Sequence, residues 1–545
     1  MVSNIIISQK EDCSPFEDIR AIKGEEAILS THQDYCIDES KLAGGYADWL
    51  FFPKNETDIV SIVNKMKEDK TPITISGART GIVGSAVPTC GGAILSFDDM
   101  KQVKGISYDK DTQRYFVRIQ PGLTLEELAD ILKYKRFSQE HNLDEEDWVQ
   151  AFKKVERGYI FPVDPTEMTA AVGGSIAANA SGGKSFKYGA MRPWVKHLRV
   201  VIESGEVLDI ERGQYMAVDS KFIIKTSEKN IEIDIPTYKM PEAKNAAGLY
   251  AKPDMDLIDL FIGSEGILGI ITEVDLWLIE KPEVLTNALF FKTEEDAINF
   301  VKKLRSIENL DVEYIEFFDE NAFNLLRSRR KTNPELANID TIPEDTTTAI
   351  FFEIPFSDDT FEEIFVILDE IATESNTSVD SGWSALDDNE RDKFRKIRHA
   401  VPEIVNSIIS KRKATYPNLH KLGTDMSVTD NHLQDIMTFY HQTLKETTLE
   451  YVIWGHIGDN HVHVNILPKN MEELELGKQL YKKFAKKAAF EYGGSVSAEH
   501  GIGKIKHEYL EIMYGEEGVE QMRSVKRKLD PEGLFNRDNV FSFTR

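Results

Sequence analysis

Cysteine is scarce in this chain, which has only Cys13, Cys36 and Cys90 among its 545 residues. The three are far apart and no C-x-x-C pair occurs, which excludes a disulfide framework and an iron–sulfur cluster held by four cysteines of this chain. Any electrons that the protein handles therefore need another carrier.

Long apolar runs and an excess of positive charge are also missing. No uninterrupted apolar run approaches the roughly 20 residues of a transmembrane helix, and Met1–Ile7 lacks a basic region followed by a long apolar core. Lys plus Arg number 65 against 92 Asp plus Glu, and the net charge of −27 repels phosphate backbones and anionic lipid surfaces. The sequence predicts a cytoplasmic protein without a transmembrane segment and without a nucleic-acid partner.

The length predicts more than one domain, because 545 residues exceed what one hydrophobic core usually holds and 41% of them are apolar. Up to about Pro282, short β-branched strands alternate with glycine turns and helices. Two unusually polar segments, residues 134–158 and 219–256, resemble insertions on that framework. Beyond this point, helical patterns such as Thr293–Ser306 and strand-like runs such as Thr348–Ile354 predict a second domain of the α+β class.

A stretch near the C-terminal end, Gly455–Asn465, carries three histidines among glycines. Valines alternate with His461, His463 and Asn465, so this half is typical of a strand with two imidazoles and an amide on one face. The Gly-Asp-Asn turn after His456 predicts that the chain folds back and brings His456 beside His463.

A second stretch, Ser497–Gly503, adds a carboxylate and a fourth imidazole. Glu499 and His500 serve one site only if the backbone bends there, and Gly501 and Gly503 permit that bend. A carboxylate with two neutral imidazoles is a ligand set for zinc or a similar ion. The alternative is that these histidines are ordinary core or surface residues, but five such groups in two glycine-bracketed clusters favour a metal site.

The glycine-rich loop Ser76–Ser85 directly follows the strand-like run Pro72–Ile75. Its small residues leave backbone N–H groups free to converge on an anionic oxygen, which suits a pyrophosphate. It is neither G-x-G-x-x-G, because Arg79 occupies the middle glycine position, nor a Walker loop. Taken alone, such a loop is more often only a turn. A second stretch of small residues, Pro162–Gly183, offers a further surface for a long ligand.

Three segments in this order resemble the flavin-binding segments of the vanillyl-alcohol-oxidase superfamily. They are Ser76–Pro88, the stretch from Asp164-Pro165-Thr166-Glu167 through Gly173–Gly183 to Gly189, and Phe261–Glu273. The histidine and Glu-His motifs, with Lys528–Gly533, resemble the branch that contains D-lactate, glycolate and D-2-hydroxyglutarate dehydrogenases. Motifs in this order over most of a chain are far more specific than any one of them.

This resemblance implies an α+β fold in which a two-subdomain PCMH-type FAD-binding domain is joined to an α+β cap domain with a mainly antiparallel sheet. The expected parts are an N-terminal arm (residues 1–45), the FAD-binding domain (46–282), a cap domain that carries the substrate and metal sites (283–503) and a C-terminal helical segment that returns to the FAD domain (504–545).

The resemblance also implies roles for individual residues. Non-covalent FAD is expected, because the first loop has no histidine for a covalent bond. The residues expected to contact it are Ser76, Gly77, Ala78, Arg79, Thr80, Gly81, Gly84, Ser85, Pro165, Thr166, Glu167, Gly173, Gly174, Ala178, Asn179, Ser181, Gly182, Glu265, Gly266 and Ile271. The expected metal ligands are His456, His463 and Glu499, the catalytic base is His500, and the substrate contacts are Arg398, Lys421 and Asn465.

The chain departs from the family pattern at several positions. Ala78 and Arg79 replace glycines that are usual in the first loop, which is costly if either residue needs a positive φ. A pairing of Arg79 with phosphate would compensate. Asn460 and His461 stand where the branch commonly has Gly-Asn, so His461 is either an extra ligand or an idle neighbour. Arg398 lies in a helix-like stretch rich in Lys and Arg, and on the alternative interpretation it is simply solvated.

The reaction that the resemblance implies is oxidation of a D-2-hydroxy acid, D-lactate-like or D-2-hydroxyglutarate-like, to the 2-oxo acid by hydride transfer to flavin N5. The expected divalent metal is zinc, and manganese and iron also suit the donors. The expected electron acceptor is a separate partner: an electron-transferring flavoprotein, an iron–sulfur protein, or a quinone or cytochrome system. A homodimer is compatible with the sequence but not indicated by it. The alternative function is that of an alkyl-dihydroxyacetone-phosphate synthase, an FAD enzyme without net redox change.

Overall fold

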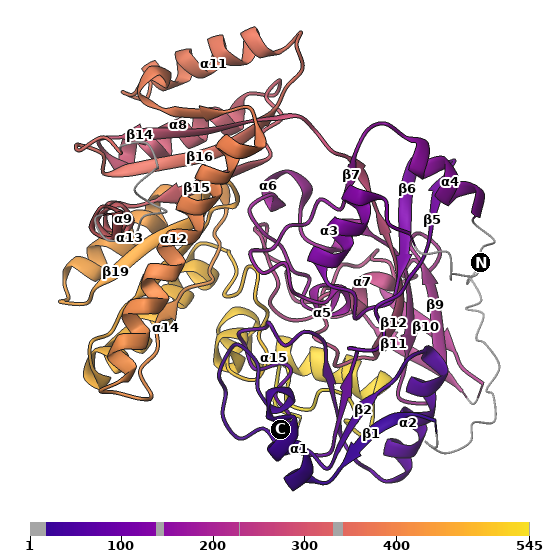
Figure 1. Cartoon of the computed structure of the whole chain (residues 1–545). Helices are drawn as coiled ribbons and strands as arrows, with labels where there is room; N and C mark the ends of the chain where they lie inside the picture. Colours follow the sequence, from indigo (N-terminus) through magenta and orange to yellow (C-terminus); the bar gives the residue numbers. More distant parts are fainter. Residues whose placement is uncertain (1–17, 138–145, 228, 331–341, 544–545) are drawn as a thin grey trace.

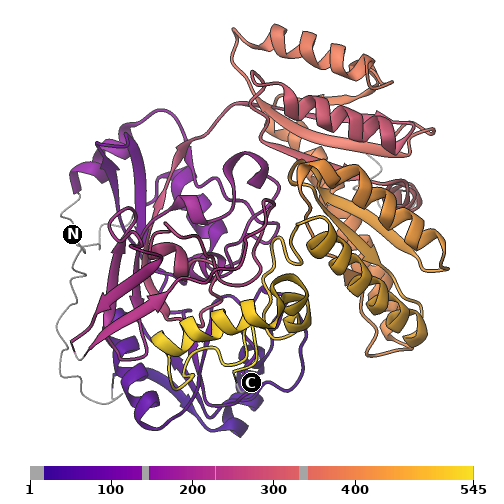
Figure 2. The ribbon, with the colours of Figure 1, turned by 180° about the vertical axis from the view of Figure 1, so that it is seen from behind.

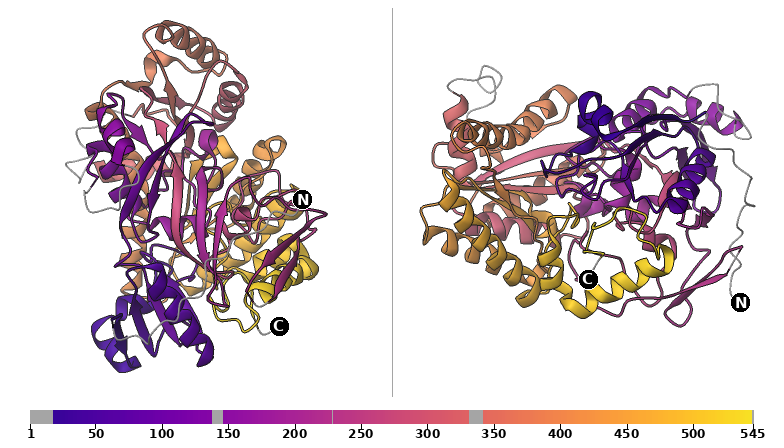
Figure 3. Two further views of the ribbon diagram at one scale, coloured as in Figure 1. Left: turned by 90° about the vertical axis from the view of Figure 1, so that its right-hand side faces the viewer. Right: turned by 90° about the horizontal axis from the view of Figure 1, so that it is seen from below.

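The chain forms two bodies that lie side by side in the computed structural model (Figure 1). The structure describes residues 18–137, 146–227, 229–330 and 342–543, so parts of the predicted N-terminal arm and of the predicted insertion at 134–158 lie outside it. The first body contains residues 18–280 and the C-terminal segment, and the second is built on residues 284–486. In the right-hand view of Figure 3 the second body, in orange, occupies one side of the molecule.

A four-stranded sheet and its helices form the first subdomain, in the order β1-β2-β4-β3. The elements are β1 (Arg20–Lys23), α1 (Glu25–Thr31), β2 (Trp49–Phe52), α2 (Glu56–Glu68), β3 (Ile73–Ser76) and β4 (Ala93–Ser96). β2 and β3 both pair parallel with β4, and β1 pairs antiparallel with β2. Helix α2 starts where Asn55 accepts a hydrogen bond from the N–H of Asp58, and it buries one apolar face. The predicted pyrophosphate loop begins at the end of β3.

A five-stranded antiparallel sheet in the order β5-β6-β12-β8-β9 forms the second subdomain. Its strands are β5 (Val103–Asp109), β6 (Arg114–Ile119), β8 (Val195–Val201), β9 (Val207–Glu211) and β12 (Ile270–Trp277), and the surrounding helices are α3 (Leu125–Tyr134), α4 (Glu146–Lys154), α5 (Val172–Ala177), α6 (Ser185–Tyr188) and α7 (Ile258–Phe261). The central strand β12 is buried along its whole length. Its polar residues have partners: Asp275, for example, accepts two hydrogen bonds from Arg118.

Two small ribbons lie beside this sheet. β10 (Lys221–Lys225) and β11 (Asn230–Asp234) form a hairpin inside the polar segment 219–256. β7 (Tyr159–Ile160) pairs with β13 (Ile279–Glu280) where the chain leaves the first body.

A seven-stranded sheet forms the second body, and every neighbouring pair in it is antiparallel, in the order β17-β14-β16-β15-β19-β20-β18. Its strands are β14 (Val284–Phe291), β15 (Tyr314–Phe318), β16 (Thr348–Pro355), β17 (Trp383–Ala385), β18 (Leu422–Gly423), β19 (Tyr451–His456) and β20 (His461–Ile466). The predicted α+β class and the mainly antiparallel sheet are confirmed.

Helices cover both faces of this sheet. They are α8 (Glu294–Ser306), α9 (Glu320–Arg330), α11 (Phe361–Thr373), α12 (Asp388–Lys413), α13 (Leu433–Lys445) and α14 (Met471–Lys486). Neighbouring residues of one strand point to opposite faces, so Phe290 packs in the core with α9 and α12 while Phe291 packs in the core with α8 and α13. Two-sided burial explains why β14 ends in a continuous apolar run, residues 288–291, instead of alternating.

The end of the chain returns to the first body. Helix α15 (His507–Leu529) contacts β11, and a parallel bridge joins Phe535 to Ile73 of β3. Figure 2 shows this helix, in yellow, along the first body. The stretch that connects β20 with α15 therefore passes from the second sheet to the flavin segments, and it contains the Glu-His motif.

Asp319 gives the fold a pH dependence that one substitution tests. The residue follows β15 and accepts a hydrogen bond of 2.8 Å from the N–H of Ala322 at the start of α9. Burial raises the pKa of this carboxyl from 3.8 to about 7. The folded chain therefore holds this proton more tightly than the unfolded chain. The contribution of Asp319 to stability is fully present below about pH 4 and is lost as the pH rises through about 7.

We expect Asp319→Asn, which keeps the acceptor oxygen and cannot ionise, to remove this contribution. In the wild type, the free energy of unfolding should decrease across this pH range by on the order of 4 kcal/mol, from roughly 3 pKa units at about 1.36 kcal/mol each. In Asp319→Asn this decrease should be absent. The measurement is the thermal midpoint across this pH range for the wild type, for Asp319→Asn and for the exposed control Asp359→Asn. Parallel curves for the wild type and Asp319→Asn would contradict the assignment.

Candidate active site

A cavity of about 310 Å³ lies where the three predicted flavin segments meet. The predicted cofactor residues that line it are Gly77, Ala78, Arg79, Thr80, Gly81, Ser85, Pro165, Thr166, Glu167, Gly173, Gly174, Ala178, Ser181, Glu265, Gly266 and Ile271. Small residues dominate this wall. A Cβ added at Gly81 or at Gly174 would meet no atom within 4 Å, so both positions face open space. The lining therefore fits a long, flat ligand that approaches the backbone closely.

Four predicted cofactor residues, Ser76, Gly84, Asn179 and Gly182, do not line the cavity. Two of them, Asn179 and Gly182, adjoin lining residues and make contacts that fix the local backbone. Asn179, for example, accepts a hydrogen bond of 3.1 Å from the N–H of Arg192. A Cβ at Gly182 would lie 2.0 Å from the carbonyl oxygen of Asp164, and only glycine permits that approach.

Arg79 stands where the family usually has glycine, and its backbone adopts the left-handed conformation, with φ of 61°. This conformation is costly for a residue that has a side chain. Its guanidinium donates to the carbonyl oxygen of Gly77 at 3.0 Å and lies 4.1 Å from the ring centre of Tyr35. These contacts hold the strained residue at the wall of the cavity. The pairing of Arg79 with phosphate stays a prediction.

The lining also includes residues that the sequence motifs did not identify, among them Asp38, Phe97 and Asn536. Asn536 accepts a hydrogen bond of 2.7 Å from the N–H of Ile75 and donates one of 2.8 Å to the carbonyl oxygen of Glu265. It joins the first and third flavin segments from a part of the chain where no motif signals a cofactor.

Glu265 links the flavin segments to the Glu-His motif. Its carboxylate accepts hydrogen bonds from the N–H groups of Ile502 and Gly503 at 2.6 and 2.8 Å, and from the hydroxyl of Ser85 at 2.8 Å. A Cβ at Gly501, whose φ is 74°, would lie 2.7 Å from Glu265 Oε1, so glycine is needed there. This contact brings Glu499 and His500, just upstream, into the wall of the same cavity.

The β19–β20 hairpin gathers the histidines as its turn predicts. His456 faces His461 across the hairpin, and Asn460 makes the turn with φ of 53°. The ring centres of His456 and His463 are 5.8 Å apart. His456, His463 and Glu499 each offer one ligand atom, and these atoms lie within 4.8 Å of one another. The residues predicted as metal ligands therefore lie together, although they come from separate parts of the chain.

The orientation of the rings fits a cation at this position. His463 Nδ1 is 2.8 Å from the carbonyl oxygen of Thr424, so Nδ1 carries the proton and Nε2, 3.9 Å from Glu499 Oε2, keeps its lone pair. Burial, with the charge of His461 adding to it, lowers the pKa of His463 well below its ordinary range. Metals bind the neutral imidazole that results.

His456 and Glu499 favour a positive charge between them. His456 Nε2 lies 3.3 Å from Glu499 Oε1, and Nδ1 lies 3.3 Å from Glu316 Oε1. Burial lowers the pKa of His456, but these two carboxylates outweigh it and raise the pKa to about 9. Burial raises the pKa of Glu499, but Lys244 and the histidines outweigh it, so the net shift is well below the ordinary value. A proton or a metal ion satisfies this pair.

Lys244 is a site residue that the sequence did not identify. Its ammonium donates to Glu499 Oε1 and, at 2.6 Å, to the hydroxyl of Ser185. It lies in the polar segment 219–256, which the sequence marks only as an insertion. The contact spans 255 positions, so no local pattern signals it.

His500 lies between the cavity and the histidine cluster. Its Nδ1 is 3.0 Å from Asp425 Oδ2, its ring is 32% exposed, and its centre is 5.9 Å from that of His463. Asp425, which the sequence did not identify either, also accepts a hydrogen bond of 2.8 Å from the ammonium of Lys506. Burial raises the pKa of Asp425, but His500 and Lys506 outweigh it and hold the pKa well below its ordinary value. An ionised Asp425 orients the ring and leaves Nε2 available to a bound molecule.

The three predicted substrate residues, Arg398, Asn465 and Lys421, differ in their contacts. Arg398, on α12, pairs with Glu316 through Nε at 2.6 Å and through Nη2, and a Cβ at Gly183 would lie 3.4 Å from Nη2. Asn465 is buried and donates to the carbonyl oxygen of His463 at 3.1 Å. Lys421 precedes β18, and burial lowers its pKa. Among the described residues, Lys421 has no hydrogen bond or ion pair that joins it to the others.

Two family models together match most of the chain. The family model described as FAD binding domain matches residues 47–147 and 146–211, and the model described as FAD linked oxidases, C-terminal domain, matches residues 281–540. The chain therefore belongs to the FAD-linked oxidases of the vanillyl-alcohol-oxidase superfamily. Its relatives place it in the branch of D-lactate, D-2-hydroxyglutarate and glycolate dehydrogenases.

The relatives cover nearly the whole chain. A D-lactate dehydrogenase of Anaerostipes hadrus is 27% identical over 95% of this chain and 94% of that protein. A D-2-hydroxyglutarate dehydrogenase of Stutzerimonas stutzeri is 26% identical over 90% of each. The glycolate oxidase subunit GlcD of Bacillus subtilis is 25% identical over 93% and 92%.

Among solved structures, an alkyldihydroxyacetonephosphate synthase has the same fold, with a TM-score of 0.61 and 16% identity over 98% of this chain and 89% of that one. No helix in the part of the chain that the structure describes is both long and apolar enough to cross a bilayer.

Proposed function

We propose that this chain is an FAD-dependent, metal-assisted dehydrogenase that oxidises a D-2-hydroxy acid to the 2-oxo acid and passes the electrons to a separate protein. One observation carries the proposal: Glu499 and His500 line the cavity of the flavin segments, while Glu499 also lies against His456 and His463. The names of the relatives support a small hydroxy acid of the D-lactate or D-2-hydroxyglutarate type.

Each group has a role that its contacts support. His456, His463 and Glu499 would hold a divalent metal such as zinc, manganese or iron, and the cavity would hold FAD. When bound, the metal stabilises charge on the substrate hydroxyl and FAD accepts the hydride. His500 accepts the hydroxyl proton at Nε2, because Asp425 holds Nδ1 in its protonated form. Arg398 uses Nη1, which is outside its pair with Glu316, to bind the substrate carboxylate.

The alternative, an ether-lipid synthase without net redox change, has less support. The structural likeness to such a synthase is at 16% identity and concerns the fold alone. The sequence relatives, which match 90% or more of the chain, carry the names of dehydrogenases and oxidases. A cytoplasmic location and a homodimer stay predictions of the sequence.

The test is a screen of D- and L-2-hydroxy acids with the purified FAD-loaded protein and an artificial electron acceptor, with and without a chelator. We expect turnover with one or more D-2-hydroxy acids, its loss after chelation and its return with added metal. Turnover that survives complete metal removal would make the histidine cluster structural. A yellow protein that no hydroxy acid reduces would contradict the proposed reaction.

Arg398→Lys tests the carboxylate contact. Lysine keeps a positive charge beside Glu316 but loses the planar guanidinium, which can bind two partners at once. We therefore expect KM for the hydroxy acid to rise about 10-fold or more, which is the usual cost of losing one hydrogen bond to a charged group. FAD and metal contents should not change. The matched control is Arg395→Lys on the exposed side of the same helix, where Arg395 pairs with Asp392. An unchanged KM in Arg398→Lys would remove Arg398 from the substrate site.

A further inference from the structure

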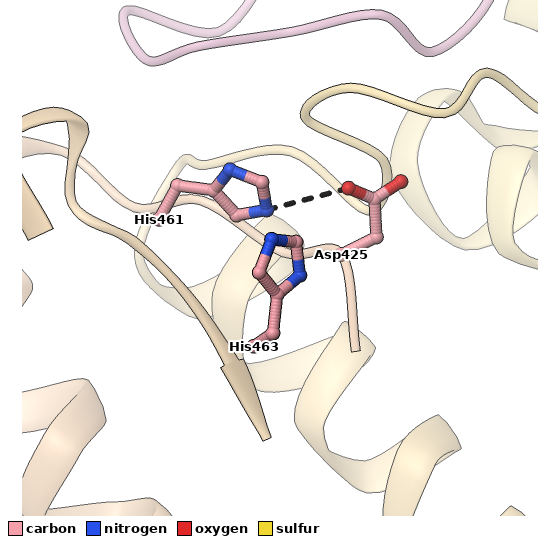
Figure 4. Close-up of side chains that lie close together, drawn as sticks. All are labelled: Asp425, His461 and His463. Carbon is pink, nitrogen blue, oxygen red and sulfur yellow. Dashed lines mark ion pairs between the residues drawn. The ribbon is translucent and has the colours of Figure 1, made fainter. Parts of the chain in front are cut away.

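His461 is the third histidine of the β19–β20 hairpin, and the proposed ligand set does not use it. Its side chain is fully buried, and neither ring nitrogen makes a hydrogen bond to any residue that the structure describes. Nε2 lies 3.3 Å from Asp425 Oδ1 without the alignment of a hydrogen bond. Nε2 therefore has an ion-pair contact with Asp425, which Figure 4 marks, whereas Nδ1 makes no hydrogen bond to any described residue. Buried polar groups in folded proteins are almost always satisfied, so a fully buried Nδ1 without a hydrogen bond indicates that something binds it.

The position of the ring indicates what binds it. His461 and His463 are two residues apart on one face of β20, and their ring centres are 4.4 Å apart (Figure 4). His461 Nδ1 is 3.9 Å from Glu499 Oε1, the same separation as that between His463 Nε2 and Glu499 Oε2. Asp425, His461 and His463 also each offer a ligand atom within 4.8 Å of the others. The two candidate groups share His463, and the contact of His461 Nδ1 with Glu499 joins His461 to the group of His456, His463 and Glu499.

The backbone holds His461 in place. Asn460, just before it, donates from Nδ2 to Asp430 at 2.6 Å and accepts at Oδ1 from Arg305 at 2.8 Å. His461 itself forms a bridge with Ser427. These contacts fix the turn and the start of β20, so the ring occupies its position without depending on an ion, as a preorganised ligand does.

We propose that the metal centre of this chain takes His461 as a third imidazole ligand, so that three imidazoles and the carboxylate of Glu499 hold one divalent transition-metal ion. Glu499 supplies the carboxylate because both oxygens of Asp425 already accept hydrogen bonds, Oδ2 from Lys506 and Oδ1 from the N–H of Glu499. Glu499 Oε1 accepts from Lys244, but Oε2 faces His463. The inference rests on the proposed metal site and extends its ligand set.

The third imidazole has a consequence for the metal that supports turnover. Four protein ligands complete a tetrahedral shell, and a zinc ion held in that way has no open position for a substrate. An ion that also binds the hydroxy acid must accept five or six ligands, as manganese(II) and iron(II) do. We therefore expect the zinc-loaded enzyme to turn over more slowly than the manganese- or iron-loaded enzyme.

Metal affinity of the FAD-loaded protein tests the assignment without a measurement of activity. The chelator-stripped wild type, titrated with Zn²⁺, should bind one ion per chain. His461→Asn should weaken zinc binding by about 10-fold or more, because loss of even a residue that only supports a metal ligand has an effect of this size. His463→Asn should weaken zinc binding further. The matched control is His441→Asn, a histidine outside the site that pairs with Glu294, and it should bind zinc as the wild type does.

X-ray absorption of the zinc-loaded wild type counts the imidazoles directly and needs no variant to fold. Three imidazoles support the inference. Two imidazoles, or an unchanged affinity in His461→Asn, would overturn it and leave the proposed site intact. A wild type that binds no ion would overturn both, and tight binding by His463→Asn would overturn the proposed ligand set.

Discussion

His500→Asn is expected to slow the reduction of bound FAD by a D-2-hydroxy acid by about 10²- to 10⁴-fold, which is the usual contribution of a general base. The reason is positional. The ring lines the flavin cavity, and Asp425 holds its Nδ1 at 3.0 Å, so Nε2 is the atom available to take the hydroxyl proton. Asparagine preserves a polar side chain of similar reach but cannot accept that proton at neutral pH. Single-turnover reduction followed by flavin absorbance gives the rate.

The controls separate this role from damage to the site. FAD and metal contents of His500→Asn should equal those of the wild type, because His500 is not among the proposed ligands of either. His420→Asn, at an exposed histidine, should reduce FAD at the wild-type rate. A reduction rate in His500→Asn within about threefold of the wild type, less than 1 kcal/mol of barrier, would reject the role of base.

Gly174→Trp is expected to give a protein that purifies without FAD. Gly174 lies in α5 at the cavity wall, and an added Cβ there meets no atom within 4 Å, so an indole would extend into the space of the cofactor without disturbing the fold. The affinity for FAD should fall by about 100-fold or more, equivalent to about 2.7 kcal/mol at about 1.36 kcal/mol per tenfold. Fluorescence titration of the FAD-free protein measures it.

Gly158→Trp is the matched control for this blockage. Gly158 is exposed in the same body and does not line the cavity, so its tryptophan variant should bind FAD as the wild type does. Circular dichroism of both variants verifies that they fold. Full FAD occupancy in folded Gly174→Trp would place the cofactor elsewhere.

Local patterns predicted the elements of the second body well. The predicted helix Thr293–Ser306 corresponds to α8, which starts where Thr293 accepts a hydrogen bond from the N–H of Asp296. The predicted strand Thr348–Ile354 corresponds to β16. An N-cap with a periodic apolar face and a run of β-branched and aromatic residues both act within a few residues, so the sequence contains the whole signal.

The proximity of His456 and His463 was predictable for the same reason, because one short turn brings them together. The proximity of Lys244, Asp425 and Glu316 to this cluster was not predictable. Their contacts with the cluster depend on how distant segments pack: for example, the N–H of Ala246 bonds to the carbonyl oxygen of Ser497. Glu316 reaches His456 through the pairing of β15 with β19 in the second sheet, whereas Lys244 reaches Glu499 from the first body. No spacing within one segment signals contacts between segments so far apart.

Single-turnover reduction of the FAD-loaded protein by a D-2-hydroxy acid, with and without its metal, tests the central claim most directly. If the flavin cavity and the cluster of His456, His463 and Glu499 are one site, the metal-loaded protein should bleach rapidly. The metal-free protein should keep its FAD and stay yellow until metal is restored. Equal rates of bleaching with and without metal would contradict the account.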